Sequence, residues 1–377
     1  MIKKNILFIE NSILPSRGGI EKVSDILSQI FEQDGHRCYF AFWHTDNASI
    51  QDSKKIKMNL KQPMQVFYNQ LSQFIKENDI NIIINQGLTQ RRIIYTLKTI
   101  KREIHNVKII NCLHNTPYFI QYLERPKSIK IQLILIIKTI LARQNIYIKE
   151  QKQLYKICDY YVVLSPSFIS EAINNFHLKD NKKLYAIGNP LVYSNNINID
   201  FIKQKEVIIV ARFDENQKNI ISALRIWKQV CERITDWSLR IIGYGEAEVL
   251  YKQYIQEQKI PNVIFEGKKD NPQIYYQKAS IFMMTSHYEG LSVTLIEALT
   301  NKCIPIAYQT FSSIKDIIWN GKNGIIIPPY NEQMYVEKII ELMSNNNLMN
   351  TYRANAQLTL SKFAHQEIRK RWYQLFD

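Results

Sequence analysis

Residues 281–307, IFMMTSHYEGLSVTLIEALTNKCIPIA, decide the fold class. Their apolar segments 281–284 and 304–307 have the length of buried strands, and a helical pattern begins between them near Val293. A strand, a helix and a second strand in this order form a unit whose two strands run parallel. The stretch therefore predicts part of a parallel sheet that is covered by helices.

The same alternation of strands and helices extends in both directions from this stretch. Further apolar strands are predicted at residues 5–9, 38–43, 80–84, 107–113, 160–164, 207–211, 239–242, 263–265 and 325–327. The alternation pauses at 188–196, GNPLVYSNN, which is rich in turn residues and which we interpret as a hinge. Because 377 residues suit two domains, the sequence predicts an α/β protein with two Rossmann-like, doubly wound parallel-sheet domains that face each other across a cleft.

Composition argues against a membrane-spanning, disulfide-rich or secreted protein. Hydrophobic residues make up 46% of the chain, yet no stretch approaches the ~18 consecutive apolar residues that cross a bilayer. The five cysteines are scattered without CxxC spacing, so neither a disulfide framework nor a cysteine zinc site is indicated. The first apolar run ends at Glu10 and is too short for a signal peptide. We therefore expect a compact cytoplasmic protein with reduced thiols and no membrane span.

Positive charge is concentrated in one segment. Residues 91–156 hold 14 Lys and Arg against 3 Asp and Glu, which is +11 of the chain's net charge of +15. Within them, 127–143 combines basic and apolar residues, a mixture typical of surfaces that settle on anionic lipid headgroups. A solvated helix face is the alternative, and the sequence contains none of the usual nucleic-acid-binding motifs. Contact with a membrane surface and an ordinary solvated face both remain open.

Two loops that follow predicted strands carry groups suited to phosphate. Gly18 and Gly19 open a helix after the first strand, where free backbone N–H groups let a phosphate approach; an ordinary turn is the alternative. Arg212 and Lys218 lie six residues apart between a strand and a helix, so one loop can bring both over a diphosphate. Two such cations with a helix N-terminus can replace a divalent metal, although a solvated loop with two ordinary charges is again the alternative.

Carboxylates and a histidine follow other predicted strands. On one continuous helix, Glu289 and Glu297 would lie about 80° apart, so we place Glu289 in the loop and Glu297 one turn into the helix. Both can then accept hydrogen bonds from the hydroxyl pairs of a sugar or a ribose, although Glu289 could also belong to a simple cap and bend. His114 ends the strand at 107–113, where parallel sheets bind ligands, although a lone histidine is commonly structural.

These features together resemble the retaining glycosyltransferases of family 4, which have the GT-B fold. The resemblance is generic over residues 1–190 and specific over 207–329. Its motifs are the arginine and lysine six residues apart, GYG at 243–245, the two glutamates that enclose seven residues, and NGKNG at 320–324. It implies an acceptor-side domain at 1–190, a nucleotide-sugar domain at 197–360, and a C-terminal helix at 361–377 that crosses back to the first domain.

The resemblance also implies roles for individual residues. Arg212 and Lys218 would hold the donor diphosphate. Glu289 would bind hydroxyls of the transferred sugar, Glu297 those of the ribose, and His114 would lie beside the reacting sugar. The other donor contacts that it implies are Gly18, Gly19, Gly243, Gly290, Leu291 and Ser292.

The chain departs from the family pattern at three places. Residues 290–292, Gly-Leu-Ser, stand where Gly-Phe-Gly is common, and Asn219 follows Lys218 where the family often has glycine. Phe311 lies where the family often has small glycines. This bulky side chain leaves the preference for sugar and acceptor open.

The implied function is that of a retaining, metal-independent hexosyltransferase. It would move a sugar from a nucleotide-sugar donor, with UDP favoured, to a glycan or lipid-linked glycan in bacterial lipopolysaccharide, capsule or exopolysaccharide assembly. It would need no cofactor, bind no nucleic acid, and work in the cytoplasm, peripherally at the inner membrane face through residues 91–156. Two alternatives are an isomerase similar to UDP-sugar 2-epimerases and a non-catalytic nucleotide-binding subunit.

Overall fold

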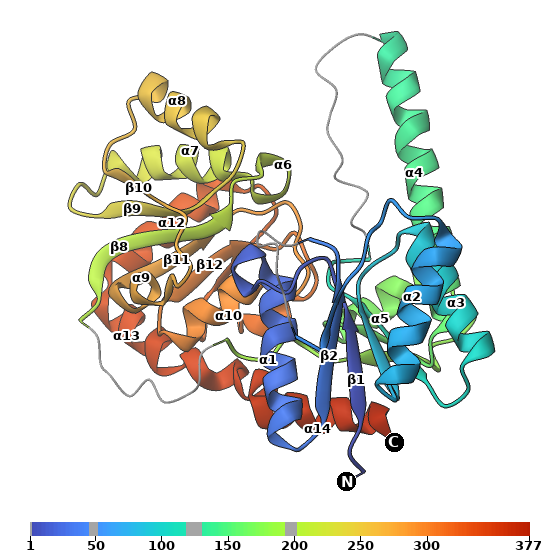
Figure 1. Ribbon diagram of the computed structural model, residues 1–377. Coiled ribbons are helices and arrows are strands. Elements are labelled where there is room, and N and C mark those ends of the chain that lie inside the picture. Colours follow the sequence, from blue (N-terminus) through green and yellow to red (C-terminus); the bar gives the residue numbers. More distant parts are fainter. Residues whose placement is uncertain (1, 45–51, 118–129, 193–201) are drawn as a thin grey trace. The chain divides into compact units, whose positions relative to one another are not determined.

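The computed structural model describes residues 2–44, 52–117, 130–192 and 202–377. This described chain divides into two compact units (Figure 1). Unit 1 contains its residues up to 190 together with 365–377, and unit 2 contains 191–364. Part of the segment that we interpret as a hinge, 193–196, lies outside the described residues, as do the side chains of 130–142.

Unit 1 is built on a parallel sheet. Its strands are β1 (Asn5–Ile9), β2 (Arg37–Phe42), β3 (Lys55–Lys57), β4 (Ile82–Gln86), β5 (Lys108–Leu113), β6 (Tyr160–Val163) and β7 (Leu184–Ala186). Their spatial order is β3-β2-β1-β4-β5-β6-β7, and every neighbouring pair runs parallel. The winding reverses between β1 and β4, which is the place where doubly wound sheets bind ligands beyond the strands' carboxyl ends.

Helices cover both faces of this sheet. They are α1 (Gly19–Gln33), α2 (Met64–Glu77), α3 (Arg91–Glu103), α4 (Lys130–Ile157), α5 (Ser167–Phe176) and α14 (His365–Phe376), and a 3-10 turn, Pro15–Arg17, precedes α1. Helices α2, α3, α4 and α5 form one layer, in which each contacts the next, and α1 contacts α14 in the other. The N-terminal half of α4 extends beyond the rest of unit 1 (Figure 1).

The C-terminal helix α14 packs against α1. Ring centroids of Trp372 and Phe376 lie 5.9 and 5.1 Å from that of Phe31, both in edge-on geometry. Arg369 Nη1 lies 3.1 Å from Asp34 Oδ1 at the end of α1. Because all three rings are buried, each edge-on pair adds about 0.5–1.5 kcal/mol to the free energy gained from apolar burial. The last residues of the chain are thereby fixed to its first helix.

Unit 2 repeats the plan with a six-stranded sheet. Its strands are β8 (Gln204–Arg212), β9 (Ser238–Tyr244), β10 (Val263–Gly267), β11 (Ala279–Met284), β12 (Ile304–Tyr308) and β13 (Ile325–Ile327). Their order is β10-β9-β8-β11-β12-β13, and all neighbouring pairs are parallel. Here the winding reverses between β8 and β11, so the carboxyl ends of these two strands mark the expected ligand position in unit 2.

The helices of unit 2 also lie on both faces of its sheet (Figure 1). They are α6 (Glu215–Lys218), α7 (Ile220–Cys231), α8 (Glu248–Gln258), α9 (Gln273–Lys278), α10 (Val293–Thr300), α11 (Ile314–Ile317), α12 (Glu332–Ser344) and α13 (Asn346–Ala354), followed by 3-10 turns at Ala356–Thr359 and Ser361–Phe363. Helices α8 and α12 both contact α7, whereas α9 contacts α10.

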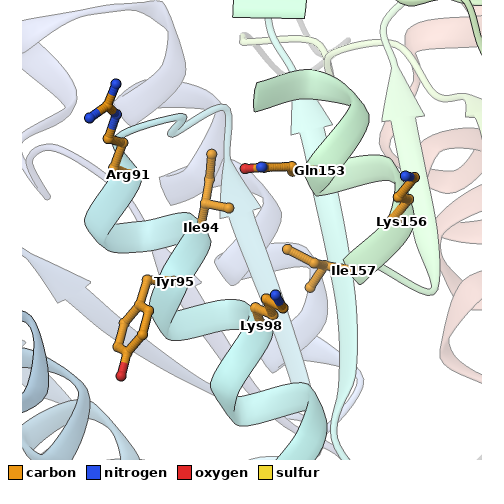
Figure 2. A pocket seen from close by; sticks show the side chains of 7 residues that line it. All are labelled: Arg91, Ile94, Tyr95, Lys98, Gln153, Lys156 and Ile157. Carbon is orange, nitrogen blue, oxygen red and sulfur yellow. The ribbon is translucent and has the colours of Figure 1, made fainter. Parts of the chain in front are cut away.

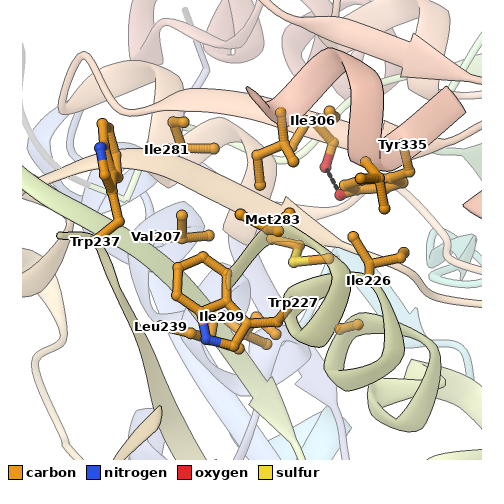
Figure 3. Close-up of a cluster of buried hydrophobic side chains, with 14 of the residues drawn as sticks. Val207, Ile209, Ile226, Trp227, Trp237, Leu239, Ile281, Met283, Ile306 and Tyr335 are labelled. Carbon is orange, nitrogen blue, oxygen red and sulfur yellow. Dashed lines mark hydrogen bonds between the residues drawn. The ribbon is translucent and has the colours of Figure 1, made fainter. Parts of the chain in front are cut away.

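The core of unit 2 lies between its sheet and the helices α7 and α12 (Figure 3). Trp227 and Tyr335 are fully buried there among branched aliphatic strand residues such as Val207. The polar atom of each ring still forms a hydrogen bond. Trp227 Nε1 donates to the Pro261 carbonyl oxygen at 3.0 Å, and the Tyr335 hydroxyl donates to the Ile306 carbonyl oxygen at 2.5 Å. The polar ends of these rings therefore add directional bonds to an otherwise apolar core.

The predicted fold class is confirmed, because both units are Rossmann-like parallel sheets with helices on either side. Two short strands at the ends of the unit 1 sheet, β3 and β7, were not predicted. Each has only three residues, and β3 reads Lys-Ile-Lys, which is too short and too polar to show a strand pattern. The five cysteines are buried and unpaired. In the described part of the chain, no helix is both long and apolar enough to cross a bilayer.

Candidate active site

The loop that follows β8 carries both predicted cations. Arg212 is the last residue of β8, and the one-turn helix α6 then ends at Lys218. Asn219 has φ of +51°, a left-handed conformation that asparagine tolerates better than most residues. It ends α6 and lets α7 begin at the next residue. The loop thus turns back over the carboxyl end of its own strand.

Hydrogen bonds to backbone carbonyl groups join this loop to the one that follows β11. His287 N donates to the Gln217 carbonyl at 2.8 Å. Asn219 Nδ2 donates to the Thr285 carbonyl at 3.1 Å, and Thr285 Oγ1 returns a bond to the Asn219 carbonyl at 2.9 Å. Because β8 and β11 are neighbours at the reversal point, these bonds hold the two loops together where a ligand is expected.

Lys218 and Glu289 meet across these two loops. Lys218 Nζ lies 2.6 Å from Glu289 Oε1, with 17% and 9% of the two side chains exposed. Ser286 Oγ donates to the same carboxylate oxygen at 2.7 Å. An ion pair at this depth has lost much of its hydration, so removing one partner leaves the other charge uncompensated. Lys218 and Glu289 therefore form a largely buried ion pair rather than a solvent-exposed one.

Arg212 occupies the same loop but is open to solvent. About 65% of its side chain is exposed, and its Nη2 lies 3.3 Å from Gln217 Oε1 and 3.7 Å from Asp214 Oδ2. The ion pair with Asp214 is weak, because exposed ion pairs contribute about 0–1 kcal/mol, and the bond to Gln217 is long. The guanidinium group can therefore turn toward an anionic ligand at little cost.

The glutamates occupy the positions expected from their spacing. Glu289 lies in the loop before α10, and Glu297 lies one turn into that helix. Both are buried, with Glu297 4% exposed. The intervening residues Gly290 and Ser292 lead into α10, where Ser292 caps the helix by accepting from Leu295 N. Ser313 Oγ donates to the Gly290 carbonyl at 2.6 Å, which fixes the loop from the β12 side.

Gly243 has a packing role of its own at the end of β9. Its φ is +152°, and an added Cβ would lie 1.8 Å from the Ala211 carbonyl oxygen and 2.8 Å from a ring carbon of Phe213. At the same place, where β9 lies against the end of β8, Phe213 N donates to the Tyr244 carbonyl oxygen at 2.7 Å. Glycine is thus required for β9 to approach the segment that leads into the cation loop.

In unit 1, the predicted residues lie near the reversal point between β1 and β4. Gly18 caps α1 and Gly19 is its first residue. A Cβ on Gly19 would meet no described atom within 4 Å, so packing does not require glycine there. His114 follows β5, and its Nε2 lies 2.6 Å from Gln86 Oε1 at the end of β4. Burial lowers the pKa of His114 to about 4, so the ring is neutral at pH 7.

Several residues of these sites were not singled out from the sequence. In unit 2 they are Gln217, Thr285 and Ser286, and in unit 1 they are Glu10, Ser24 and Gln86. Most are ordinary polar residues without a motif. One signal was available, since Glu10 ends the first apolar strand abruptly, as an acid at a strand's carboxyl end.

The basic segment contributes a cavity between α3 and α4 of unit 1 (Figure 2). The cavity measures about 410 Å³ and is lined by Arg91, Ile94, Tyr95, Lys98, Gln153, Lys156 and Ile157. Three of these residues are cations, and none is an acid. Lys127 lies outside the described residues, and the side chains of Lys130 and Lys138 are not described. Within the described ranges, no cluster of three or more His, Cys, Asp or Glu could hold a metal ion.

Known proteins match part of this chain in sequence and nearly the whole of it in fold. Residues 196–359 match the family model "Glycosyl transferases group 1". The poly(glycerol-phosphate) alpha-glucosyltransferase of Bacillus subtilis is 30% identical over 177 residues, which cover 47% of this chain and 26% of that protein. The amylovoran biosynthesis glycosyltransferase AmsD of Erwinia amylovora is 28% identical over 233 residues, covering 59% and 63%. The chain thus spans less than two thirds of either relative.

A solved structure extends the match in fold to the whole chain. A point mutant of Staphylococcus aureus TarM, crystallised with fondaparinux, alpha-GlcNAc-glycerol and UDP, has a TM-score of 0.75 at 14% identity. The match covers 99% of this chain and 100% of that one. The two parallel-sheet units therefore have the GT-B glycosyltransferase fold, and residues 196–359 carry a domain of the Glycosyl transferases group 1 family.

Proposed function

We propose that the protein is a retaining glycosyltransferase of family 4 that moves a hexose from a UDP-sugar to a glycan acceptor during assembly of a bacterial surface polysaccharide. The observation that carries this proposal is the buried Lys218–Glu289 pair at the reversal point of the unit 2 sheet, inside the domain that matches the glycosyltransferase family. The TarM complex with UDP supports the choice of nucleotide.

The chemistry needs charge stabilisation where the sugar–phosphate bond breaks. When the bond between sugar C1 and the phosphate oxygen cleaves, its electron pair remains on UDP, and the acceptor oxygen forms the new bond to C1 from the same face. Arg212 and Lys218 stabilise the charge that develops on the diphosphate, in the manner of an oxyanion hole. With two cations in this role, we propose that no divalent metal is needed, and EDTA is expected to leave turnover unchanged.

The remaining residues bind and orient the donor. Once Lys218 turns toward the diphosphate, the carboxylate of Glu289 is released from its ion pair and can accept bonds from sugar hydroxyls. Glu297, buried at the next turn, suits the hydroxyl pair of the ribose. Backbone N–H groups of residues 290–292 at the start of α10 add donors for the phosphate oxygens. His114, with Gly18 and Gly19, would contribute from unit 1.

A donor screen tests the activity directly. The purified protein is incubated with a panel of UDP- and GDP-sugars and with membrane lipid extracts, and nucleotide release and the glycan products are measured. We expect release of UDP that depends on an acceptor, with a product heavier by one hexose unit. An isomerised UDP-sugar formed without acceptor would indicate the epimerase-like alternative, and binding of UDP without turnover across the panel would contradict an enzymatic role.

We also propose that the enzyme works peripherally on the cytoplasmic face of the plasma membrane, with the α3–α4 cavity against anionic lipid headgroups. Ile94 and Ile157 give the cavity apolar walls, while Arg91, Lys98 and Lys156 supply its positive charge (Figure 2). Within the described chain, no ion pair engages these three cations, although Glu150 interacts electrostatically with Arg91 from a longer distance. This combination suits the phosphate and the upper acyl segment of a lipid.

Charge reversal in this cavity is expected to weaken membrane binding. Because each cation near an anionic membrane contributes about 1 kcal/mol, the variant Lys98→Glu/Lys156→Glu should lower partitioning onto phosphatidylglycerol vesicles by at least ~10-fold. The matched control Lys205→Glu/Lys252→Glu changes the same charge on exposed lysines of unit 2. An equal loss in both variants, measured by vesicle co-sedimentation, would show that net charge rather than the cavity decides binding.

A further inference from the structure

The ion pair between Lys218 and Glu289 engages two groups that the proposed donor needs separately. Lys218 Nζ lies 2.6 Å from Glu289 Oε1, and 17% and 9% of the two side chains are exposed. Within the described chain, no second ion pair engages either residue. A diphosphate that binds Lys218 and a hexose that binds Glu289 must therefore both compete with a contact already present inside the protein.

Arg212, the other cation of the loop, has no such competing contact. About 65% of its side chain is exposed, and the nearest carboxylate oxygen, that of Asp214, lies 3.7 Å away. A diphosphate can reach this guanidinium group without displacing a buried partner. Of the two cations, only Lys218 must give up a buried partner when a diphosphate binds.

The backbone on both sides of the ion pair is fixed. His287 N donates to the Gln217 carbonyl oxygen at 2.8 Å, which joins the two loops that carry the pair. Thr310 Oγ1 donates to the Ser286 carbonyl oxygen at 2.6 Å, which joins the second loop to the segment after β12. A bound donor is therefore expected to change the partners of the two side chains and to leave the two loops in place.

Ser286 provides the bond to Glu289 that remains when Lys218 turns away. Its Oγ donates at 2.7 Å to Oε1, the same carboxylate oxygen that faces Lys218. Without Lys218, this hydroxyl is the last donor to the carboxylate among the described residues. One neutral hydroxyl does not balance a carboxylate at this depth, because a buried charge that has lost its partner is costly.

We propose that the Lys218–Glu289 pair makes the site select an intact sugar nucleotide over the free nucleotide. With a UDP-sugar, the diphosphate replaces Glu289 as the partner of Lys218, and hydroxyl groups of the hexose replace Lys218 as partners of Glu289. With UDP, only the first exchange takes place, and Glu289 is left buried and charged. This preference rests on the proposed function and adds to it a means of releasing the nucleotide product.

The charge on UDP strengthens this preference. Its terminal phosphate has one more ionisable oxygen than the diphosphate of the donor, so it repels the stranded Glu289 carboxylate more strongly. A site that binds hydroxyl groups through a buried polar group also rejects a ligand that lacks them, because that group is then left unpaired. We therefore expect the unmodified protein to bind its UDP-sugar at least about tenfold more tightly than UDP.

Calorimetric titration with UDP tests the proposal through one neutral substitution. Glu289→Gln keeps the size of the side chain and removes its charge, so that bound UDP no longer leaves a buried anion. We expect this variant to bind UDP at least about tenfold more tightly than the unmodified protein does, although it alters a residue of the proposed site. An affinity for UDP that stays the same or falls in Glu289→Gln would overturn the proposal.

Glu341→Gln is the matched control. Glu341 is exposed in α12, where it pairs with Lys338, and its substitution removes the same charge from unit 2. The affinity of this control for UDP should stay within twofold of that of the unmodified protein. An equal gain in Glu289→Gln and in the control would show that net charge decides UDP binding, and would also overturn the proposal.

Two further titrations use the same proteins and one more variant. The UDP-sugar turned over in the donor screen should lose its preference over UDP in Glu289→Gln, and a preference that survives there would contradict the exchange of partners. Ser286→Ala keeps the charge of Glu289 and removes its last donor, so it should weaken UDP binding. If Glu289→Gln does not fold, Ser286→Ala decides, because tighter or unchanged binding of UDP in that variant would overturn the proposal.

These results separate the proposal from the function on which it rests. Failure of the unmodified protein to bind UDP, or any sugar nucleotide of the donor panel, would contradict the proposed function and this preference with it. Binding of UDP and turnover of its sugar nucleotide, together with an unchanged or lower UDP affinity in Glu289→Gln, would contradict the preference alone.

Discussion

Replacing Lys218 with alanine is expected to lower kcat/KM for the UDP-sugar by about 10²–10³-fold, the typical effect of removing one preorganised charge from a transition state. The ammonium group pairs with Glu289 Oε1, which also accepts a hydrogen bond from Ser286 Oγ, at the reversal point of the sheet where a diphosphate is expected. Arg212→Ala should have an effect of the same kind. Steady-state rates of UDP release measure both variants.

The Lys218 prediction needs a control for folding. Loss of Lys218 leaves Glu289 buried without its partner, so the variant is also expected to unfold at a lower temperature. Lys205→Ala removes a solvent-exposed ion pair with Asp236 in the same unit and should change neither rate nor stability measurably. Near-normal turnover in both Arg212→Ala and Lys218→Ala would contradict the assignment of the diphosphate to these two cations.

Substituting alanine at Gly243 should destabilise unit 2 by about 3–5 kcal/mol, which combines backbone strain at positive φ with an overpacked contact. The added Cβ would lie 1.8 Å from the Ala211 carbonyl oxygen, a distance that only a shift of β9 away from β8 relieves. Urea unfolding followed by circular dichroism measures the change.

Gly19→Ala is the matched control for stability. It places a methyl group where no described atom lies within 4 Å, at the first residue of α1. Alanine should leave the unfolding midpoint unchanged or raise it slightly, because glycine is the poorer helix former. A Gly243→Ala protein as stable as the unmodified one would show that β9 and the segment after β8 can separate without cost, contrary to the packing described above.

The fold could be predicted because most of its strands are short, continuous runs of apolar residues. Buried parallel strands read as short apolar runs, and most of them, such as 325–327, were recognised within one or two residues. The strands that were missed are β3 and β7, which pair at the ends of the sheet and have three residues each. The first reads Lys-Ile-Lys and lacks an apolar run, and the second, Leu-Tyr-Ala, is too short to stand out as a strand. Edge strands are stabilised by pairing with a neighbour, and a linear sequence does not display that pairing.

The candidate site could be predicted only in part. Arg212, Lys218 and Glu289 were assigned to loops at the carboxyl ends of strands, and the structure places them there. The ion pair between Lys218 and Glu289 was not predicted, since the two residues are 71 positions apart. Their contact depends on β8 and β11 being neighbours, which is a property of strand order rather than of either motif.

The contact between Gln86 and His114 in unit 1 was beyond prediction for the same reason. Each residue lies at the end of a strand, and each alone is an ordinary polar residue near an apolar run. They are 28 positions apart, and only the pairing of β4 with β5 in the sheet brings them together.

A crystal structure of the protein with UDP tests the central claim most directly. The account predicts the diphosphate within hydrogen-bonding distance of Arg212 and Lys218 at the carboxyl ends of β8 and β11, and the ribose hydroxyls on the carboxylate of Glu297. Nucleotide bound at any other edge of the sheet, or a Glu297 carboxylate remote from the ribose, would contradict it.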